Sequence, residues 1–287
     1  MATRPVLVAL YVPGDRPDRF AKALAAGADQ VILDLEDAVA VERKELARSA
    51  VAELLAGEVS GRVAVRPNGA GTPWHQADLA MLATAPHRPA LRLPKVESPA
   101  DVDRVLAALA AGAGGGTGGS PGEVELTCLL ESALGVEHAL AIATHPAVTA
   151  IGLGEADLRA DLGITAEEGL DWLRVRTVVA ARAAGLEPPA MAVYPRLDDP
   201  DGLRASCRRG AALGLRGRTA IHPKQIAGIR EAFAPTAAEV ADAEQVLAAL
   251  TGSAGAVRLP DGQMVDEAMA AEARRTLARR FPDTSSQ

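Results

Sequence analysis

The sequence predicts an α/β fold, a closed (β/α)8 TIM barrel with a C-terminal helical extension. Eight short apolar runs recur between Val6 and His222, separated by segments with the apolar spacing of helices. Most of these runs are continuously apolar, which is typical of parallel strands buried on both faces. The chain has 287 residues, enough for one such barrel and an added arm. A doubly wound open sheet is the alternative, but a count of eight repeats favours closure.

The order of the runs defines the expected elements. Strands are expected over 6–12, 31–35, 62–66, 90–94, 124–130, 148–153, 189–194 and 217–222. Helices are expected over 18–27, 41–55, 76–84, from Ser98 onward, over 167–184, 199–213, 236–250 and 266–280. Ser98-Pro99-Ala100-Asp101 is a typical helix start, with a cap, a proline and an acid. We therefore expect a barrel domain over 1–232 and a helical arm over 233–287 that packs on a neighbouring subunit.

Composition excludes several classes of protein. The net charge of −7 and the 2% aromatic content argue against a nucleic-acid partner. No apolar run is long enough for a signal peptide or a membrane span. Cys128 and Cys207 are far apart and form no disulfide or metal motif, so we expect reduced thiols in a cytoplasmic protein. The glycine-rich stretch 111–123 lacks a phosphate-loop ending and precedes a strand, so we expect a flexible loop without function.

The strand ends predict a site. The carboxyl ends of parallel strands face one crevice, so Glu131 and Asp157, which follow neighbouring strands, can meet there. Ordinary solvated loop acids are the alternative. However, charged groups follow most of the expected strands, namely Asp15 and Arg16, Asp34 to Asp37, Arg66, Lys95, Glu131, and Glu155 with Asp157. This sorting to one end favours a Mg²⁺ site with two protein ligands and further positions for substrate and water. Zinc would need His or Cys groups that are absent here, and we expect the lone His222 to be structural.

The motifs resemble a known family. They are LYVPGDRPDRFAKAL, VILDLEDAVA, VRPNGAGTPW, LPKVES, LLESALGV, GLGEADL, AIHPKQI and GQMVDEAM. In this order, from about Val6 to Arg280, they closely resemble the citrate lyase β-subunit-like family, within the wider group of HpcH/HpaI aldolases and malyl-CoA or citramalyl-CoA lyases. The resemblance implies a TIM barrel, Mg²⁺, acyl-CoA and 2-oxo acid chemistry, and a homo-oligomer that is a trimer or a multiple of one.

The resemblance also implies roles for individual residues. Glu131 and Asp157 match the metal ligands, and Arg66 matches the arginine that contacts the keto acid and the developing enolate. Asp266 matches an acid delivered from the neighbouring subunit, although an aspartate in front of a helix is also an ordinary N-cap. The remaining matches are Arg16 and Lys22, with Arg19 on the same face, for the coenzyme A phosphates; Glu36 and Asp37, for water on the metal; and the amides of Gly154, Glu155 and Ala156, for a substrate carboxylate. Asp37 could instead cap the following helix.

Two departures bear on the substrate. The family more often has Ala-Glu where this chain has Glu155-Ala156, so a role for that second acid is doubtful. Met191-Ala192 stands where an Asp-Gly is often found, which could reshape the acyl pocket.

We expect reversible Claisen-type cleavage of a 3-hydroxy-3-carboxyalkyl-CoA, of the malyl-, citramalyl- or citryl-CoA type. The products are a 2-oxo acid and acetyl-CoA or a homologue. The alternatives are an aldolase acting on free 2-oxo-4-hydroxy acids, a malyl-CoA-type thioesterase, and a non-catalytic acyl-CoA-binding subunit. An aldolase would not need Arg16 and Lys22, and a non-catalytic subunit would be expected to lose at least one of the matched site residues.

Overall fold

The computed structural model describes residues 6–112, 124–251, 255–259 and 262–279. The chain divides into two compact units, Met1–Ile229 and Arg230–Gln287. The glycine-rich stretch lies almost wholly outside the described residues. Within the described residues no helix is long and apolar enough to cross a membrane.

The first unit is built on a parallel sheet of seven strands in the order β6-β5-β4-β3-β2-β1-β7. The strands are β1 (Val8–Pro13), β2 (Gln30–Asp34), β3 (Val63–Arg66), β4 (Ala90–Leu93), β5 (Leu126–Leu130), β6 (Val148–Leu153) and β7 (Arg218–Ala220). Consecutive strands from β1 to β6 are neighbours, and β7 returns to pair with the first strand, Leu10 opposite Ala220. This order confirms the expected α/β class with a parallel sheet, and among the described residues the sheet is open between β6 and β7.

The prediction of a strand over 189–194 was wrong, because the segment does not form a strand of that length. Only Met191 forms a bridge, parallel to Arg218, and its backbone N–H donates to the Gly217 carbonyl at 2.9 Å. Pro188, Pro189 and Pro195 flank the segment and have no N–H to donate, which limits its pairing. Within the described residues β6 does not pair with this segment, so the sheet has seven strands there instead of eight.

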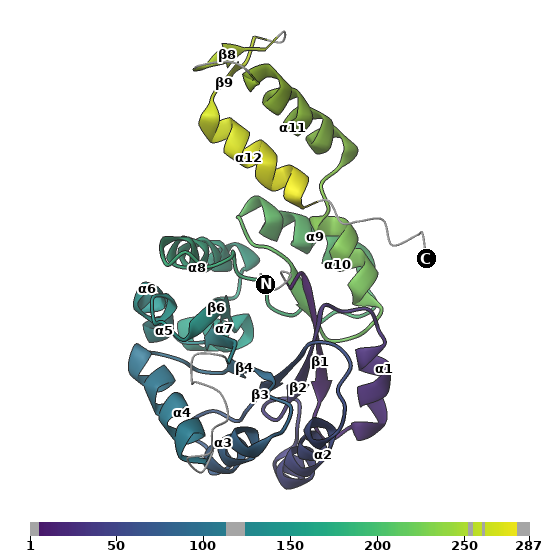
Figure 1. Cartoon of the computed structure of the whole chain (residues 1–287), viewed down its shortest axis with the longest axis vertical. Helices are drawn as coiled ribbons and strands as arrows, with labels where there is room; N and C mark the ends of the chain where they lie inside the picture. The colour runs from purple at the N-terminus through teal and green to yellow at the C-terminus, as the bar shows by residue number, and fades with distance from the viewer. Residues whose placement is uncertain (1–5, 113–123, 252–254, 260–261, 280–287) are drawn as a thin grey trace. The chain divides into compact units, whose positions relative to one another are not determined.

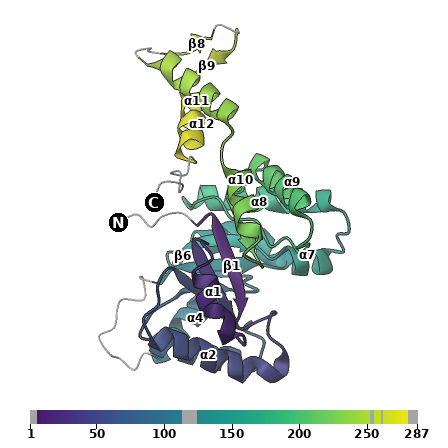
Figure 2. The same cartoon turned by 90° about the vertical axis from the view of Figure 1, so that its right-hand side faces the viewer.

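Helices lie on the outer side of the strands, and Figures 1 and 2 show α1 to α4 around β1 to β4. The helices of the first unit are α1 (Phe20–Leu24), α2 (Lys44–Ala56), α3 (His75–Thr84), α4 (Pro99–Gly112), α5 (Ala133–Glu137), α6 (Ala139–Ala143), α7 (Glu155–Leu162), α8 (Asp171–Ala183), α9 (Pro200–Ala212) and α10 (Gln225–Phe233, which runs into the second unit). Short 3-10 turns, η1 (Pro17–Arg19), η2 (Val41–Arg43) and η4 (Glu167–Leu170), precede α1, α2 and α8. The α-helix expected over 18–27 is shorter than predicted. It covers only Phe20–Leu24, and residues 25–27 are not helical.

The interior of the sheet is apolar at its base and polar above. Ala9, Ile32 and Ala64 form a buried cluster with Val6, Tyr11 and Ala90 packed against it. Because side chains alternate along a strand, the next inward positions are Asp34 on β2 and Arg66 on β3. This small-residue layer leaves room at the carboxyl ends for the charged groups that follow.

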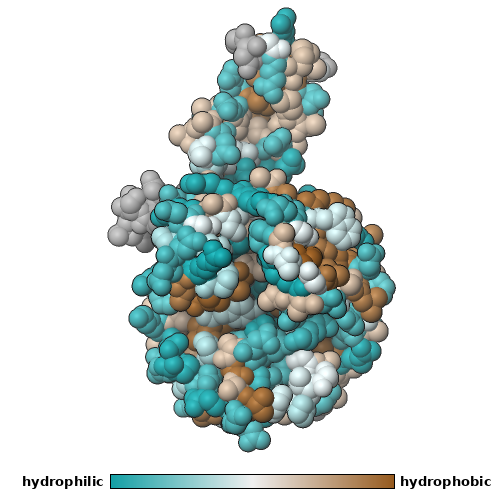
Figure 3. Space-filling view, turned by 180° about the vertical axis from the view of Figure 1, so that it is seen from behind, coloured by the Kyte–Doolittle hydropathy of each residue, from teal (hydrophilic) through white to brown (hydrophobic). Residues whose placement is uncertain are grey.

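One surface of this unit is unusually apolar. Figure 3 shows brown residues gathered over the side formed by α5, α6 and α8. The exposed apolar side chains there include Leu134, Leu140, Trp172 and Val179, and Trp172 is 60% exposed.

The second unit is a pair of helices joined by a small hairpin. Its elements are α11 (Ala237–Leu250), β8 (Val257–Arg258), β9 (Met264–Val265) and α12 (Glu267–Ala278). Thr236 and Glu239 form a reciprocal capping box at the start of α11. At α12, the Asp266 carboxylate accepts hydrogen bonds from the N–H groups of Ala268 (3.0 Å) and Met269 (3.2 Å), which makes it the N-cap.

Candidate active site

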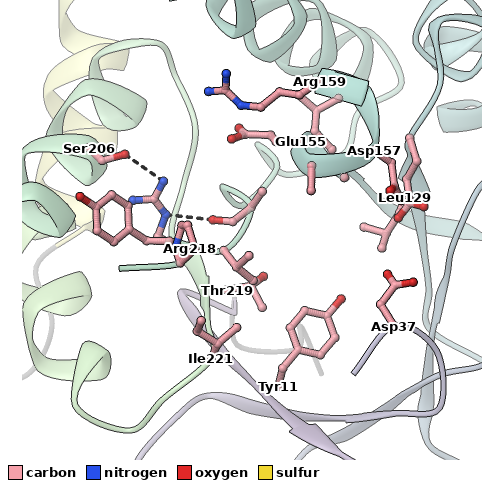
Figure 4. Close-up of a pocket in the computed structure, with 18 of the residues that line it drawn as sticks. Tyr11, Asp37, Leu129, Glu155, Asp157, Arg159, Ser206, Arg218, Thr219 and Ile221 are labelled. Carbon is pink, nitrogen blue, oxygen red and sulfur yellow. Dashed lines mark hydrogen bonds between the residues drawn. The ribbon is translucent and has the colours of Figure 1, made fainter. Parts of the chain in front are cut away.

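A cavity of about 1210 Å³ opens among the strand ends of the first unit. Its lining comes from strands β1 to β7, from α7 to α9 and from the segment 192–196. Figure 4 shows Tyr11, Asp37, Leu129 and Asp157 around one part of it and Arg218 and Ser206 at the other. Of the residues singled out in the sequence, Asp37, Arg66, Glu131, Gly154, Glu155, Ala156 and Asp157 line this cavity.

Arg66, at the end of β3, is held by Asp34 at the end of β2. Its Nε and Nη2 donate to the two carboxylate oxygens of Asp34 at 2.7 and 2.6 Å, in the bidentate geometry that suits a guanidinium. Its third nitrogen, Nη1, donates to Asp37 at 3.1 Å. Burial lowers the pKa of Arg66, but the Asp34 carboxylate outweighs it and raises the pKa above its ordinary value. Arg66 is thus a fixed positive charge with one nitrogen turned toward an exposed partner.

Three carboxylates converge on the ammonium group of Lys95. Its Nζ lies 2.7 Å from Glu36 Oε1, and 3.9 Å from both Glu131 Oε2 and Asp157 Oδ2. Lys95 is the one non-glycine residue with positive φ among the described residues, at 54°. Such a conformation is costly for a residue with a side chain and is often found at functional sites. The sequence places Lys95 at the end of a strand but gives no signal for its role.

Glu131 lacks an adequate counter-charge. Its carboxylate is buried, and Oε2 has no hydrogen-bond partner in the described part of the chain. Burial, together with the nearby Glu36, raises the pKa of Glu131 to about 8. Burial also raises the pKa of Glu36, whose Oε2 likewise accepts no hydrogen bond. Buried carboxylates with unused oxygens are what a hard divalent cation binds, so the donor set fits Mg²⁺. Among the described residues, no group of three or more His, Cys, Asp or Glu side chains is arranged to hold a metal ion.

The turn after β6 is shaped around Glu131. A Cβ on Gly154 would lie 2.5 Å from Glu131 Cγ and 2.7 Å from Oε1, so only glycine fits. Gly154 is the N-cap of α7, whose first N–H groups are unpaired and suit an anion. The Glu155 side chain is used elsewhere, because it accepts two hydrogen bonds from the buried Arg174, from Nε at 2.7 Å and from Nη2 at 2.8 Å. Only its backbone remains available to a ligand.

Five predicted site residues are absent from this cavity lining, and one of them, Glu36, instead accepts a hydrogen bond from Lys95. Arg16, Arg19 and Lys22 are on η1 and α1, and Arg19 and Lys22 are exposed. Arg16 is paired with Asp18, with its Nε and Nη2 at 3.0 and 2.9 Å from the carboxylate oxygens. Asp266 belongs to the second unit, where it caps α12.

Sequence patterns miss two supporting residues. Asp34 stands at a predicted strand end, but its pairing with Arg66 depends on two strands being neighbours. Lys44 is buried on α2, and its Nζ donates to the carbonyl oxygens of Leu35 and Glu36 at 2.7 Å each. Its helical position gives no sequence signal that would separate it from a solvated lysine.

Comparisons with known proteins find relatives over most of the chain. A family model described as HpcH/HpaI aldolase/citrate lyase matches residues 7–223. A (3S)-malyl-CoA thioesterase of Cereibacter sphaeroides is 35% identical over 285 residues, 96% of this chain and 94% of the relative. An L-malyl-CoA/beta-methylmalyl-CoA lyase from the same species is 35% identical over 274 residues, 86% of this chain and 85% of the relative. The crystal structure of CitE from Mycobacterium tuberculosis in complex with magnesium, acetoacetate and coenzyme A superimposes with a TM-score of 0.82 at 34% identity, covering 96% of this chain and 97% of that one.

Proposed function

The chain belongs to the HpcH/HpaI aldolase/citrate lyase family, and we propose that it is a Mg²⁺-dependent carbon–carbon lyase acting on a CoA ester. It reversibly cleaves a 3-hydroxy-3-carboxyalkyl-CoA of the malyl-, citramalyl- or citryl-CoA type into a 2-oxo acid and acetyl-CoA or a homologue. The observation that carries this proposal is the group of Glu36, Glu131 and Asp157 around one cationic position beside Arg66.

Glu131 and Asp157 are the protein ligands of the metal in this proposal, and Glu36 and Asp37 hold water on it. The unpaired Oε2 of Glu131 and its raised pKa support this assignment. When bound, Mg²⁺ supplies a template and a Lewis acid for the substrate's hydroxyl and carboxylate oxygens. Lys95 holds the carboxylates together until then, because its ammonium group is the cation that they face.

The chain's own groups act on the bond that breaks. A base takes the proton of the C3 hydroxyl, so that the C3 oxygen becomes a carbonyl. The C2–C3 bond breaks, and its electron pair forms the enolate of the thioester. Arg66 binds the oxo acid and stabilises the developing negative charge, through the Nη1 group that now donates to the exposed Asp37. The N–H groups of Glu155 and Ala156 bind the substrate carboxylate at the start of α7. The expected use of the Gly154 N–H was wrong, because this group donates to the Leu130 carbonyl at 3.0 Å. Asp266 delivers the proton to the enolate carbon.

Arg16, Arg19 and Lys22 bind the coenzyme A phosphates in this proposal. Arg19 and Lys22 are exposed, and the three form a cationic group on one short segment. Asp266 comes from a neighbouring subunit, within a homo-oligomer that is a trimer or a multiple of one. The exposed apolar side chains on α5, α6 and α8 support an interface between subunits.

We further propose that the sheet closes as an eight-stranded barrel with 189–191 in the seventh position, and that residues 233–287 form the arm that reaches the neighbour. The bridge between Met191 and Arg218 supports this closure. Reduced, buried Cys128 and Cys207 support a cytoplasmic location.

A thioesterase is the second candidate, because a relative with that name is 35% identical over 96% of this chain. It would use the same ester and the same cation but break the C–S bond with water. An aldolase on free hydroxy-oxo acids is a weaker alternative, and coenzyme A bound to the CitE neighbour argues for a CoA substrate.

A panel of hydroxyacyl-CoA esters, assayed with Mg²⁺ and with EDTA, tests the proposal. We expect Mg²⁺-dependent release of a 2-oxo acid. Free CoA without any 2-oxo acid would replace the lyase with the thioesterase. If no ester is cleaved but free hydroxy-oxo acids are turned over, the protein is an aldolase and the lyase proposal is wrong.

A further inference from the structure

The chain has two tyrosines, and both line the active-site cavity beneath an arginine. The guanidinium of Arg218 lies over the ring of Tyr194, with 5.6 Å from Cζ to the ring centre. Tyr11 has two such neighbours, Arg66 at 4.8 Å and Arg92 at 5.6 Å. The proposed reaction assigns a role to Arg66 but none to Tyr11 or Arg92.

Arg92 projects from β4 into the centre of the sheet's interior. Its Nη2 donates to the Thr219 hydroxyl on β7 at 3.3 Å. The position of a Cβ on Gly152 of β6 lies 4.0 Å from the same Nη2, and the Tyr11 ring is on β1. Arg92 therefore meets three other strands, above the apolar base formed by Ala9, Ile32 and Ala64. It lies on the floor of the cavity.

Arg92 is half-buried, and it differs from the three buried arginines of the described chain in its partners. Arg66 and Arg174 are each held by carboxylates, and Arg218 donates to the Ala192 carbonyl, the Ser206 hydroxyl and the Cys207 sulfur. Arg92 has no carboxylate partner among the described residues, and its buried Nε has no hydrogen-bond partner there. Of five guanidinium N–H groups, one donates to Thr219. A half-buried charge whose buried Nε has no partner is costly unless an anion joins it.

The Tyr11 hydroxyl adds a second unused donor. It makes no hydrogen bond to any residue that the structure describes, and Figure 4 shows it pointing into the cavity. Burial raises the pKa of Tyr11, so it keeps its proton at neutral pH. Among the neighbouring charges, Arg92 and Arg66 lower the pKa of Tyr11 most, and Asp34 and Glu131 raise it by less. The hydroxyl is thus a proton donor inside the cavity, on a ring that both Arg92 and Arg66 contact.

We propose that Arg92, Tyr11 and Thr219 form a carboxylate-binding subsite on the cavity floor, which makes Arg92 a specificity-determining residue. The ligand is a second carboxylate on the oxo-acid half of the substrate, so that the enzyme prefers a 2-oxodicarboxylate product over a 2-oxomonocarboxylate. This substrate assignment rests on the proposed lyase function, whereas the carboxylate subsite does not.

Calorimetric titration with a matched pair of 2-hydroxy acids, in Mg²⁺, tests the subsite on the full-length protein. Malate and lactate share the hydroxyl and carboxylate that face the metal, and malate alone has a second carboxylate. We expect malate to bind about ten- to a hundredfold more tightly than lactate, the usual range for a hydrogen bond between charged groups. Arg92→Met should abolish this preference without weakening lactate, Arg92→Lys should retain part of it, and Tyr11→Phe should reduce it less.

The control is Arg216→Met, which removes an arginine paired with Glu187 and absent from the cavity lining, and it should leave both affinities unchanged. The subsite is wrong if the wild-type protein binds both acids equally or binds neither, if the preference survives in Arg92→Met, or if that variant weakens both acids alike. If Arg92→Met does not fold, Arg92→Lys and Tyr11→Phe test the same subsite, and an undiminished preference for malate in both would reject it.

A cleavage assay of the same preparations separates this subsite from the function. If CoA esters are cleaved but malate is not bound in preference to lactate, the lyase proposal holds and the subsite is wrong. A preference for malate that depends on Arg92, without cleavage of any CoA ester, would keep the subsite and reject the lyase.

Discussion

Asp34 holds the position of Arg66, because its two oxygens accept from two of the three guanidinium nitrogens. In Asp34→Asn the buried guanidinium loses its principal counter-charge, and we expect about 3–5 kcal/mol lower stability. We also expect kcat/KM to fall about a hundredfold, since the arginine would no longer be oriented. Denaturant unfolding and steady-state kinetics measure the two effects. An unchanged kcat/KM would show that Asp34 is not needed to position Arg66.

Glu131 is the residue on which cation binding depends. Saturating Mg²⁺ should stabilise the wild-type protein against unfolding, by about 2.7 kcal/mol at a hundred times the Kd. In Glu131→Gln the effect should be close to zero, because a neutral amide replaces the buried carboxylate. Thermal unfolding with Mg²⁺ and with EDTA measures this. Glu58→Gln, at an exposed surface position, is the control and should keep the wild-type response. A full response in Glu131→Gln would contradict the metal assignment.

At the residue scale the sequence could predict the carboxylates and Arg66, because strand ends in a parallel sheet collect at one edge. It also placed Lys95 at this edge, but it could not predict the 2.7 Å contact of Lys95 Nζ with Glu36 Oε1, which depends on how the turn after β4 folds. Nor could it predict that Arg174 donates hydrogen bonds to the Glu155 carboxylate, because the packing of α7 and α8 brings the two residues together.

Among the elements, the turn between β6 and α7 is sensitive to a single methyl group. In Gly154→Ala the new Cβ would overlap the Glu131 side chain, so we expect loss of the Mg²⁺-dependent stabilisation as well as lower basal stability. The matched control is Gly71→Ala, where a Cβ would meet nothing within 4 Å. Thermal unfolding of both variants with and without Mg²⁺ checks this. An unimpaired Mg²⁺ response in Gly154→Ala would show that Glu131 tolerates displacement.

Helix α2 supports the loop after β2 through Lys44. Lys44→Met would leave the Leu35 and Glu36 carbonyls without their shared donor, so the loop that bears Glu36 and Asp37 should loosen. We expect about 1–3 kcal/mol lower stability and a lower kcat. Lys224→Met, at an exposed lysine, is the control in unfolding and kinetic assays. Wild-type kcat in Lys44→Met would mean that the loop needs no such support.

Strands β1 to β6 were predictable because each is a continuous apolar run, and their observed bounds differ from the expected ones by two residues at most. The seventh run was not, because proline limits hydrogen bonding there and leaves only the Met191 bridge. Apolar content thus indicates burial, whereas strand formation also requires free N–H groups.

For the whole molecule, the proposed oligomer predicts that each active site uses residues of two chains. Glu131→Gln and Asp266→Asn should each be nearly inactive. When the two are mixed and reassembled, about a quarter of the sites should combine intact residues from different chains and regain activity. Activity after mixing, followed against the unmixed variants, measures this. A mixture that stays inactive would place Asp266 in its own chain's site or outside the reaction.

In the proposed reaction a carbon–carbon bond breaks while the thioester survives. The most direct measurement is mass spectrometry of the products from a hydroxyacyl-CoA labelled with ¹³C in its acyl chain, with Mg²⁺ present. We predict labelled acetyl-CoA, or a labelled homologue, together with an equal amount of 2-oxo acid. Unesterified CoA together with the intact labelled hydroxy acid would contradict the lyase and identify a thioesterase.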